Sequence, residues 1–337
     1  MLQKPNASPG ASREPKSRLA AGGSQDWLTH EGAIQAAFGR IQPYIRETPV
    51  EQWGATGVYL KLEHLQRTGS FKLRGASNKI ALLTPEQAAR GVVAASNGNH
   101  GLGVAAAAQV RGIEAEVFVS AHVAVAKARR IEALGARIRT VGDDPLTAEL
   151  AARRAAEESG RVFISPYNDR DVIAGQGTIG VELHRQVSNL DAIFVAVGGG
   201  GLIGGIGAYY KVVSPRTEIV GCWPQNSPVL YECLRAGRII HVAEQATISE
   251  STAGNLEEES VTLEYCRGAI DRSVLVSEHE ILAAMRLMLE TEHWLIEGAA
   301  AVAVAAYLKE VKRYEGRKAA IVLCGRNLSA DALRRVL

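Results

Sequence analysis

The sequence predicts an α/β protein whose mainly parallel β-sheet is covered by helices on both faces. Short β-branched runs alternate with longer segments of helical periodicity, which is the pattern of successive strand–helix–strand units. One run, residues 192–197, is apolar throughout, as expected of a parallel strand buried on both faces. Glycine is frequent (34 residues) and aromatic residues are scarce (5%), which suits closely packed helices and strands. At 337 residues the chain is long enough for two lobes.

Composition narrows the classes of protein that this chain can be. With 47% hydrophobic and 22% charged residues it can bury a large core, which excludes an intrinsically disordered protein. Lysine and arginine (38) nearly balance aspartate and glutamate (36), so the net charge of +2 predicts no binding to nucleic acid or an anionic membrane. The four cysteines are widely spaced, without a CxxC pair or a nearby histidine at ligand spacing. Disulfides and a structural zinc site are therefore not expected.

We expect neither a targeting segment nor a membrane anchor. Residues 1–25 mix Pro, Ser, Gly, Lys and Arg without an apolar core, which predicts a disordered tail rather than a signal peptide. The longest apolar run, residues 298–308, is far shorter than the ~20 residues of a spanning helix and predicts a buried helix of small residues. A cytoplasmic location is the resulting expectation.

Strands and helices are expected to alternate along the chain, with no internal repeat and no long linker. The expected strands are residues 58–62, 92–95, 115–119, 138–141, 162–164, 193–197, 218–222, 274–276 and 320–323. The expected helices include residues 101–110, 123–134, 145–159 and 172–187.

Four successive glycines are the strongest local signal for a ligand site. Gly198, Gly199, Gly200 and Gly201 follow a buried strand and precede a helical segment that begins near Leu202. Glycines let the backbone approach a ligand closely, and their N–H groups, with the positive end of the following helix dipole, suit a phosphate. The alternative without a ligand is a tight strand-to-helix turn.

The same run also permits a dinucleotide site. Gly199, Gly201 and Gly204 satisfy the GxGxxG pattern, which needs an acidic residue at the end of the next strand to bind the ribose. Here the acidic residue, Glu218, begins that strand instead. A phosphate site is therefore favoured over a dinucleotide site.

Lys72 lies in an apolar segment behind a Gly-Ser turn. Its neighbours are Phe71 and Leu73, and such surroundings can desolvate an amine and lower its pKa, as imine chemistry requires. The alternative is an ordinary charge on the surface of a helix.

A polar loop follows the expected strand at 92–95 and opens a helix. It consists of Ser96, Asn97, Gly98, Asn99 and His100. Backbone N–H groups of such a loop can hold a carboxylate, and Asn99 can donate to a phenolate-type oxygen. Ser96 or Asn97 could also serve as a helix N-cap, and a lone histidine more often packs than catalyses.

Cys324 lies at the carboxyl end of the last expected strand, where ligands of open α/β sheets bind. The thiol could face a cofactor ring or be a small buried side chain. A lysine for an imine, a glycine loop for a phosphate, an asparagine for a ring hydroxyl and a thiol at a strand end together suit pyridoxal phosphate (PLP), whose ring is an electron sink.

The sequence resembles the PLP enzymes of the tryptophan-synthase-β class, known as fold type II, and within them the serine/threonine dehydratase family. The resemblance runs from about residue 32 to the C-terminus and carries five signatures in order: Ser70-Phe71-Lys72, residues 96–101, Gly175-Gln176-Gly177-Thr178, residues 198–202 and Cys324-Gly325. It implies two lobes, each with an open, twisted, mainly parallel sheet flanked by helices, and a homodimer. The large PLP-binding lobe would comprise residues 26–84 and 164–337, and the small mobile lobe residues 85–163.

The resemblance implies a role for each matching residue. Lys72 would bind the cofactor covalently and later move the Cα proton, Phe71 would pack near the ring, and Asn99 would contact the ring 3-hydroxyl. Cys324 would face the pyridine nitrogen as a neutral partner, which suits elimination over transamination. The phosphate would be cradled by Gly198, Gly199, Gly200, Gly201 and Leu202, and the substrate carboxylate would be held by Ser96, Asn97, Gly98, Asn99 and His100.

The sequence departs from the family pattern at several positions. Asn97 stands where serine-racemising relatives have a second serine that acts as acid and base, so racemase activity is not expected. Trp223 and Val229 stand where metal-dependent relatives have acidic residues, so we expect no metal site. Arg326 replaces the usual glycine after the cysteine and adds a positive charge near the expected pocket.

The implied reaction is α,β-elimination of water from a 3-hydroxy amino acid such as L-threonine or L-serine, giving a 2-oxo acid and ammonia. Residues 251–257 and 96–100 look most like the hydroxyectoine-utilisation dehydratase branch, which suggests a hydroxyectoine-derived substrate. Two alternatives of other kinds stay open. A β-replacement enzyme usually has an asparagine directly after the lysine, where this chain has Leu73, and an NAD-dependent oxidoreductase would use Gly199, Gly201 and Gly204.

Overall fold

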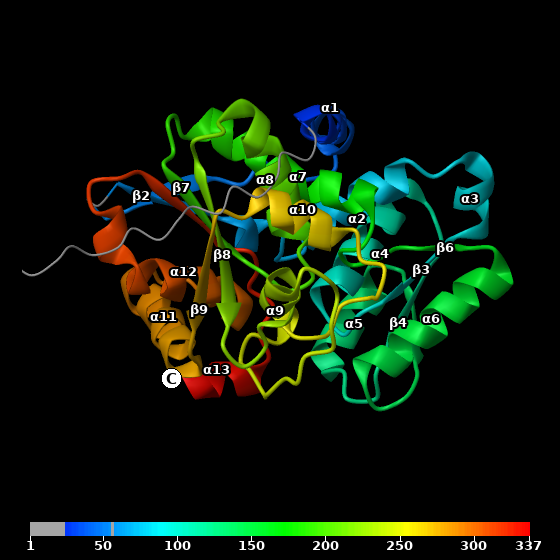
Figure 1. Ribbon diagram of the computed structural model, residues 1–337. Helices are drawn as coiled ribbons and strands as arrows, with labels where there is room; N and C mark the ends of the chain where they lie inside the picture. Colours follow the sequence, from blue (N-terminus) through cyan, green and yellow to red (C-terminus); the bar gives the residue numbers. More distant parts are fainter. Residues whose placement is uncertain (1–23, 55–56) are drawn as a thin grey trace, which may run out of the picture.

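The structure is a computed structural model that describes residues 24–54 and 57–337. Within these residues the chain forms two separate sheets with helices packed around them, as the α/β prediction requires (Figure 1). Most of the predicted tail, residues 1–23, lies outside the described residues. The prediction placed the end of the tail at residue 25, whereas helix α1 already begins at Ser24.

Each strand and helix named in the sequence analysis is present, with ends that lie within two residues of those expected. The strands are β1 (Val50–Trp53), β2 (Val58–Lys61), β3 (Val92–Ala95), β4 (Ala115–Val119), β5 (Arg137–Thr140), β6 (Val162–Phe163), β7 (Ala192–Ala196), β8 (Glu218–Pro224), β9 (Arg272–Val276) and β10 (Ala319–Val322). The α-helices are α1 (Ser24–Ile41), α2 (Lys72–Ala81), α3 (Pro85–Arg90), α4 (Asn99–Arg111), α5 (Val125–Ala133), α6 (Pro145–Ser159), α7 (Arg170–Gln186), α8 (Gly201–Val213), α9 (Val229–Ala236), α10 (Thr262–Ala269), α11 (Glu278–Thr291), α12 (Gly298–Lys309) and α13 (Ala330–Val336). Short 3₁₀ turns are η1 (Glu63–Leu65), η2 (Glu250–Thr252) and η3 (Val311–Tyr314).

The larger sheet has six strands in the order β1-β2-β10-β7-β8-β9. All its pairs are parallel except β1 with β2, which is antiparallel. Strands β7 and β10 are apolar and buried at every position, because helices cover both faces: α7 and α8 on one side, α11 and α12 on the other (Figure 1). The expected buried helix of small residues is α12.

The smaller sheet has four parallel strands in the order β5-β4-β3-β6. Alternate residues of β3 face opposite sides, as the two-residue period of a strand requires. Val92 and Ala94 pack with residues of α4 and α5, whereas Val93 packs against alanines of α6 such as Ala152. This sheet lies within residues 85–163, the segment expected to form the small lobe.

Glycines bring three helices into backbone contact beside the larger sheet. A Cβ atom on Gly175 of α7 would lie 2.6 Å from the Cα of Gly75 on α2. A Cβ atom on Gly205 of α8 would lie 2.7 Å from the backbone nitrogen of Gly177 on α7. Because real Cβ atoms do not approach so closely, this packing of α2, α7 and α8 requires glycine. It gives a structural reason for the Gly175-Gln176-Gly177-Thr178 signature.

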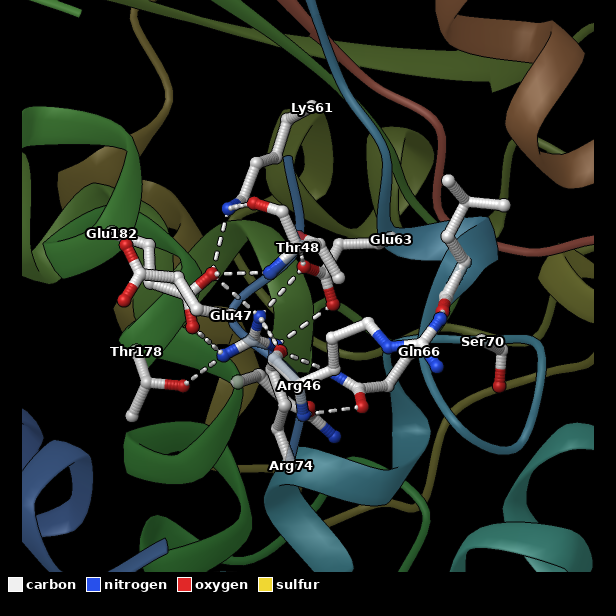
Figure 2. Close-up of polar contacts among 12 residues, drawn as sticks. Arg46, Glu47, Thr48, Lys61, Glu63, Gln66, Ser70, Arg74, Thr178 and Glu182 are labelled. Carbon is white, nitrogen blue, oxygen red and sulfur yellow. Dashed lines mark hydrogen bonds and ion pairs between the residues drawn. The ribbon is translucent and has the colours of Figure 1, made fainter. Parts of the chain in front are cut away.

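A cluster of four buried charges anchors the start of α2 (Figure 2). Arg74 donates to both oxygens of Glu63, at 2.7 and 2.8 Å, and to both oxygens of Glu182, also at 2.7 and 2.8 Å. Lys61 on β2 donates to Glu182 at 2.6 Å. All four side chains are fully buried, so their two positive and two negative charges compensate one another. Since the four come from β2, η1, α2 and α7, the cluster fixes the first turn of α2, where Lys72 lies.

Candidate active site

A cavity lies at the carboxyl ends of β7 and β10, beside the first residues of α2, α4 and α8. The structure places many of the predicted cofactor residues on its wall: Phe71, Lys72, Asn99, Gly198, Gly199, Gly200, Gly201, Leu202 and Cys324. Ser96, Asn97, Gly98 and His100 are not among its lining residues. A separate, wider cavity near Leu73, Leu102 and Val110 contains none of the predicted cofactor residues. The first cavity is therefore the candidate active site.

Lys72 is the first residue of α2 and points into this cavity. Its Nζ donates to the backbone oxygen of Pro166 at 2.7 Å and lies 5.3 Å from the centre of the Phe71 ring. Burial, opposed by Cys324 and Glu297, lowers the pKa of the Lys72 amine to about 8. About a tenth of the amine is thus neutral at pH 7, far more than for an ordinary lysine, and able to react with a carbonyl.

The glycine loop connects β7 to α8 with the conformation that the sequence predicts. Gly200 has φ +87°, a left-handed value that favours glycine. A Cβ atom on Gly198 would lie 2.8 Å from the Cα of Thr252, and one on Gly199 would lie 2.3 Å from the ring of Tyr167. The loop is thus a cradle that side chains would fill, with its backbone N–H groups at the positive end of α8.

Asn99 reaches the cavity from the first position of α4. Its Nδ2 donates to the Glu297 carboxylate, 2.8 Å from Oε1 and 3.0 Å from Oε2. Its Oδ1 accepts a hydrogen bond from Nδ2 of Asn327 at 2.6 Å. Burial raises the pKa of Glu297, and the hydrogen bond from Asn99 opposes that rise. The amide is therefore held on both sides while it lines the cavity.

The other residues of the polar loop are used for structure around Asn99. The side chain of Asn97 pairs with Ser120 through both of its polar atoms, at 2.7 and 2.9 Å. Ser96 Oγ accepts from the backbone N–H of Gly98 at 3.1 Å. The N-cap position of α4 is Gly98, so neither Ser96 nor Asn97 is the N-cap.

His100 is buried next to the polar loop. Its Nε2 lies 2.7 Å from the backbone oxygen of Ile164. Burial, with the charge of Lys72, lowers the pKa of His100 to about 3, so the ring stays neutral in the working range. Neither its position nor its pKa suits it to exchange protons with a ligand in the cavity.

The strand-end segment contributes a buried thiol. Cys324 follows β10, and its backbone oxygen accepts from the N–H of Phe71 at 3.1 Å. Burial, and secondly Glu297, raise the pKa of Cys324 well above its usual value, so the thiol stays neutral. Arg326 is exposed and does not line the cavity.

Several cavity residues were not predicted from the sequence. Glu297, Tyr167 and Ser251 line the cavity, yet none belongs to a recognisable motif: Glu297 and Tyr167 lie in connections, and Ser251 lies in the short turn η2. Glu297 directly precedes the apolar helix α12, and a single acidic residue at the edge of such a buried segment is the signal that could have identified it. Ser251 lies in residues 251–257, a segment whose resemblance to one dehydratase branch predicts a substrate class but no contact in the cavity.

A family model described as "Pyridoxal-phosphate dependent enzyme" matches residues 41–325 of the chain. The chain belongs to this family. The L-threonine ammonia-lyase of Thermotoga maritima is 41% identical to it over 280 residues, which are 83% of this chain and 69% of that protein. The putative threonine dehydratase of Sinorhizobium fredii is 36% identical over 312 residues, which are 90% of this chain and 94% of that protein.

Solved structures of PLP enzymes share the fold. The processed form of threonine deaminase isoform 2 from Solanum lycopersicum matches with a TM-score of 0.89 and 30% identity, covering 98% of both chains. Maize serine racemase matches with a TM-score of 0.85 and 31% identity, over 90% of this chain and 95% of that one. The predictions of fold type II, of PLP as the cofactor and of a PLP-dependent enzyme are thereby confirmed. The nicotinamide alternative is set aside.

The residues of the cavity fit PLP. The glycine loop offers a phosphate a cradle of backbone N–H groups that no other residue type would leave open. Lys72 supplies an amine of lowered pKa, and Cys324 supplies a neutral thiol at a strand end. These two side chains and the loop line one cavity, so a single cofactor can contact all three.

We predict that the apoprotein takes up added PLP faster as the pH rises through about 8, after which the rate levels off. Only the neutral amine attacks an aldehyde, and burial, opposed by Cys324 and Glu297, lowers the pKa of Lys72 to that value. The measurement is the rate at which the visible absorbance of the bound cofactor develops at each pH. A rate still rising at about pH 10 would indicate an amine with the ordinary lysine pKa of about 10.4 and would contradict the prediction.

Proposed function

We propose that the protein is an ammonia-lyase that eliminates water from an L-3-hydroxy amino acid, giving a 2-oxo acid and ammonia. The observation that carries the proposal is one cavity in which an amine of lowered pKa, a glycine cradle and a neutral buried thiol meet. Relatives named as a threonine ammonia-lyase and a putative threonine dehydratase support this reaction. Leu73 supports it against β-replacement, because this side chain is buried in the core rather than in the cavity.

Four parts of the chain would hold the cofactor. The N–H groups of residues 198–202 would bind its phosphate, Phe71 would pack near its ring, and Asn99 would donate to the ring hydroxyl. Cys324, a thiol of raised pKa, would be the neutral partner of the ring nitrogen and would leave that nitrogen without a proton. The bound PLP supplies an electron sink that makes the Cα proton of the substrate acidic.

Lys72 and the polar loop act on the substrate. Ser96 to His100 would hold its carboxylate at the start of α4, where the helix dipole favours an anion. The N–H groups of Ser96 and Gly98 already donate within the protein, so those of Asn97, Asn99 and His100 would donate to the carboxylate. Lys72 Nζ then takes the Cα proton as the general base. The glycine loop would hold the cofactor's phosphate beside the leaving hydroxyl group, which takes up a proton and departs as water. The unsaturated amine that is released tautomerises and hydrolyses to the 2-oxo acid and ammonia.

The reaction test is chiral chromatography of a reaction with L-threonine or L-serine. We expect 2-oxo acid and ammonia with no detectable D-amino acid. Racemisation needs an acid on the face opposite Lys72, and an amide cannot give and regain a proton near neutral pH. Asn97 is moreover paired with Ser120 through both of its side-chain polar atoms. A D-isomer formed as fast as the oxo acid would contradict this prediction, whereas absence of both ammonia and oxo acid would contradict the proposed function.

The matched variant is Asn97→Ser, which restores the hydroxyl found in serine-racemising relatives. We expect a small increase in D-isomer, with elimination still dominant, because a new hydroxyl alone does not rebuild a proton relay. The same chromatographic assay measures both products. A variant with no increase at all would show that position 97 does not face the substrate.

Treatment with a chelator is expected to leave activity and thermal stability unchanged. Trp223 and Val229, which stand where metal-dependent relatives have acidic residues, are both buried apolar side chains here. Within residues 24–54 and 57–337, no three His, Cys, Asp or Glu side chains gather in a way that could hold a metal ion. Assays and melting curves with and without EDTA check this. A loss that added Mg²⁺ reverses would locate a cation site elsewhere.

The finer substrate assignment is also a proposal. The resemblance of residues 96–100 and 251–257 to the hydroxyectoine-utilisation dehydratase branch supports a hydroxyectoine-derived amino acid, and both segments contribute residues to the cavity, namely Asn99 and Ser251. Comparing kcat/KM for that substrate class with kcat/KM for L-threonine and L-serine tests the assignment. A preference for threonine would leave the ammonia-lyase proposal intact and overturn the finer one.

The predicted homodimer, which rests on the resemblance, and the cytoplasmic location, which rests on the expected lack of a targeting segment or anchor, stay proposals. Light scattering of the purified protein tests the first, and cell fractionation tests the second. None of the helices in the described part of the chain has both the length and the apolar character needed to span a membrane. The division into lobes of residues 26–84 with 164–337 and residues 85–163 is likewise a proposal, which the two separate sheets support.

A further inference from the structure

We propose that Asn327 is a positioning residue that fixes the orientation of the Asn99 amide, and that Arg130 in turn holds Asn327. The inference rests on the proposed role of Asn99 as the donor to the cofactor's ring hydroxyl. Neither Asn327 nor Arg130 lines the cavity. The side chain of Asn327 reaches the cavity through Asn99, and its backbone N–H donates to Glu297 at 3.1 Å, a contact that a side-chain substitution leaves in place.

The contacts of Asn99 with Glu297 and Asn327 determine which end of its amide faces each neighbour. The ionised Glu297 carboxylate has hydrogen-bond acceptors and no donor. It therefore faces the Nδ2 end of the amide, which lies 2.8 and 3.0 Å from its two oxygens. Asn327 offers an N–H at 2.6 Å, so it requires Oδ1. A turn of the amide by 180° would place two donors together and two acceptors together. In this orientation Nδ2 also makes a long contact to Ser251 Oγ at 3.5 Å on the cavity wall, and a ligand in the cavity would replace this weak contact.

The orientation of Asn327 is itself fixed by two further contacts. Its Nδ2 also donates to the backbone oxygen of Thr68 at 2.9 Å, and its Oδ1 accepts from Arg130 at 2.7 Å. An arginine has only donors, so it can contact only the oxygen end of the amide. Arg130 thus fixes the orientation of the Asn327 amide, and Asn327 fixes the orientation of the Asn99 amide.

The backbone at Gly69 leaves room for the side chain of Asn327. A Cβ atom on Gly69, where φ is +80°, would lie 2.7 Å from Oδ1 of Asn327. Glycine at this position therefore leaves the space that the Asn327 amide occupies. Asn99 and Asn327 are each at most 9% exposed, so water does not readily replace the bonds between them.

The hydrogen bonds from Arg130 through Asn327 to Asn99 also link the two sheets. Asn99 and Arg130 belong to α4 and α5, which pack with the four-stranded sheet. Asn327 follows β10 of the six-stranded sheet. The donor to the ring hydroxyl is therefore oriented only when the two sheets stand in this arrangement.

The test compares Asn99→Ala, Asn327→Ala and the double variant, each loaded with PLP and without substrate. Loss of a donor at the ring hydroxyl shifts the visible absorbance of the bound cofactor, a signal that general destabilisation does not mimic. We expect Asn327→Ala to shift this band in the same direction as Asn99→Ala and to lower kcat roughly tenfold, as for one lost hydrogen bond. In the Asn99→Ala background the second change is expected to add nothing to either readout.

Two further variants keep the test decisive. Asn327→Asp preserves the volume and the acceptor for Arg130 but removes the donor to Asn99, so it should show the same spectral shift even if the alanine variant folds poorly. Arg130→Met should give a smaller shift in the same direction. Its control is Arg129→Met, which removes the same charge from the next position of α5. Both arginines are exposed, but it is Arg130 that donates to Asn327, so the control should shift nothing.

The outcomes separate the two proposals. If Asn99→Ala shifts the band but the Asn327 variants do not, or if their effects add to those of Asn99→Ala, the positioning role is overturned and the proposed function stands. If Asn99→Ala itself leaves the band and kcat unchanged, the assigned role of Asn99 is wrong and the positioning role is overturned with it.

Discussion

Lys72→Ala is expected to abolish both the visible absorbance of the lysine-bound cofactor and the release of ammonia. Lys72 is the amine on the wall of the cavity whose pKa burial lowers to about 8, and the same side chain is proposed as the general base. Loss of a general base alone typically lowers a rate by roughly 10²–10⁴-fold, and loss of the covalent link to the cofactor adds to that. Absorbance spectra and an ammonia assay measure the two effects.

The control for this prediction is Lys79→Ala on the same helix. Lys79 lies in the last turn of α2, where its Nζ pairs with Asp169 at 2.7 Å and with Asp171 at 2.9 Å, and it does not line the cavity. The control variant should keep the absorbance band and most of the activity. Persistence of the band in Lys72→Ala, or turnover by that variant without an added amine, would show that another residue carries the cofactor.

Arg74→Met is expected to reduce the free energy of unfolding by about 3–5 kcal/mol, the usual cost of removing one partner from a buried ion cluster. The variant leaves the carboxylates of Glu63 and Glu182 buried with Lys61 as the remaining cation of the cluster. Methionine fills part of the volume, so most of the loss comes from the uncompensated charge rather than from a cavity. Urea denaturation followed by circular dichroism gives the value.

An exposed ion pair provides the comparison for Arg74→Met. Arg334 pairs with Asp331 at the surface, where the two side chains are 74% and 88% exposed. Arg334→Met should change the free energy of unfolding by no more than about 0.5 kcal/mol. Equal effects of the two substitutions would mean that the buried cluster does not hold the start of α2 as described.

Most strands and helices could be predicted from the sequence because they are buried on at least one face. Strands such as β7 and β10 carry continuous apolar runs that periodicity detects. Strand β1 was missed, since it is a short edge strand with exposed polar residues at its centre, and its antiparallel pairing with β2 depends on a neighbour rather than on its own pattern. Its formation is a tertiary effect that local propensity does not encode.

The candidate site was predicted unevenly for a related reason. Lys72, Asn99 and the glycine loop lie in contiguous motifs at the ends of strands, so both their chemistry and their place in the fold are visible in the sequence. Glu297 became visible only in the structure, because its partner Asn99 lies 198 residues away along the chain. The pairing of Asn97 with Ser120 likewise needed two strand ends to meet, and it directs that amide into a structural contact.

The backbone contacts among α2, α7 and α8 bear on which of the cofactor's contacts can move relative to one another. Lys72 begins α2 and the phosphate-binding glycines lead into α8, while α7 lies against both helices without intervening side chains. The proposed attachments of the cofactor's aldehyde and phosphate are thus fastened to a single block. The proposed donor to its ring hydroxyl, Asn99, and the loop proposed to hold the substrate carboxylate lie instead on α4 and beside the four-stranded sheet. Movement between the sheets would therefore disturb the contacts to the ring hydroxyl and the substrate together and leave the separation of Lys72 from the glycine loop unchanged.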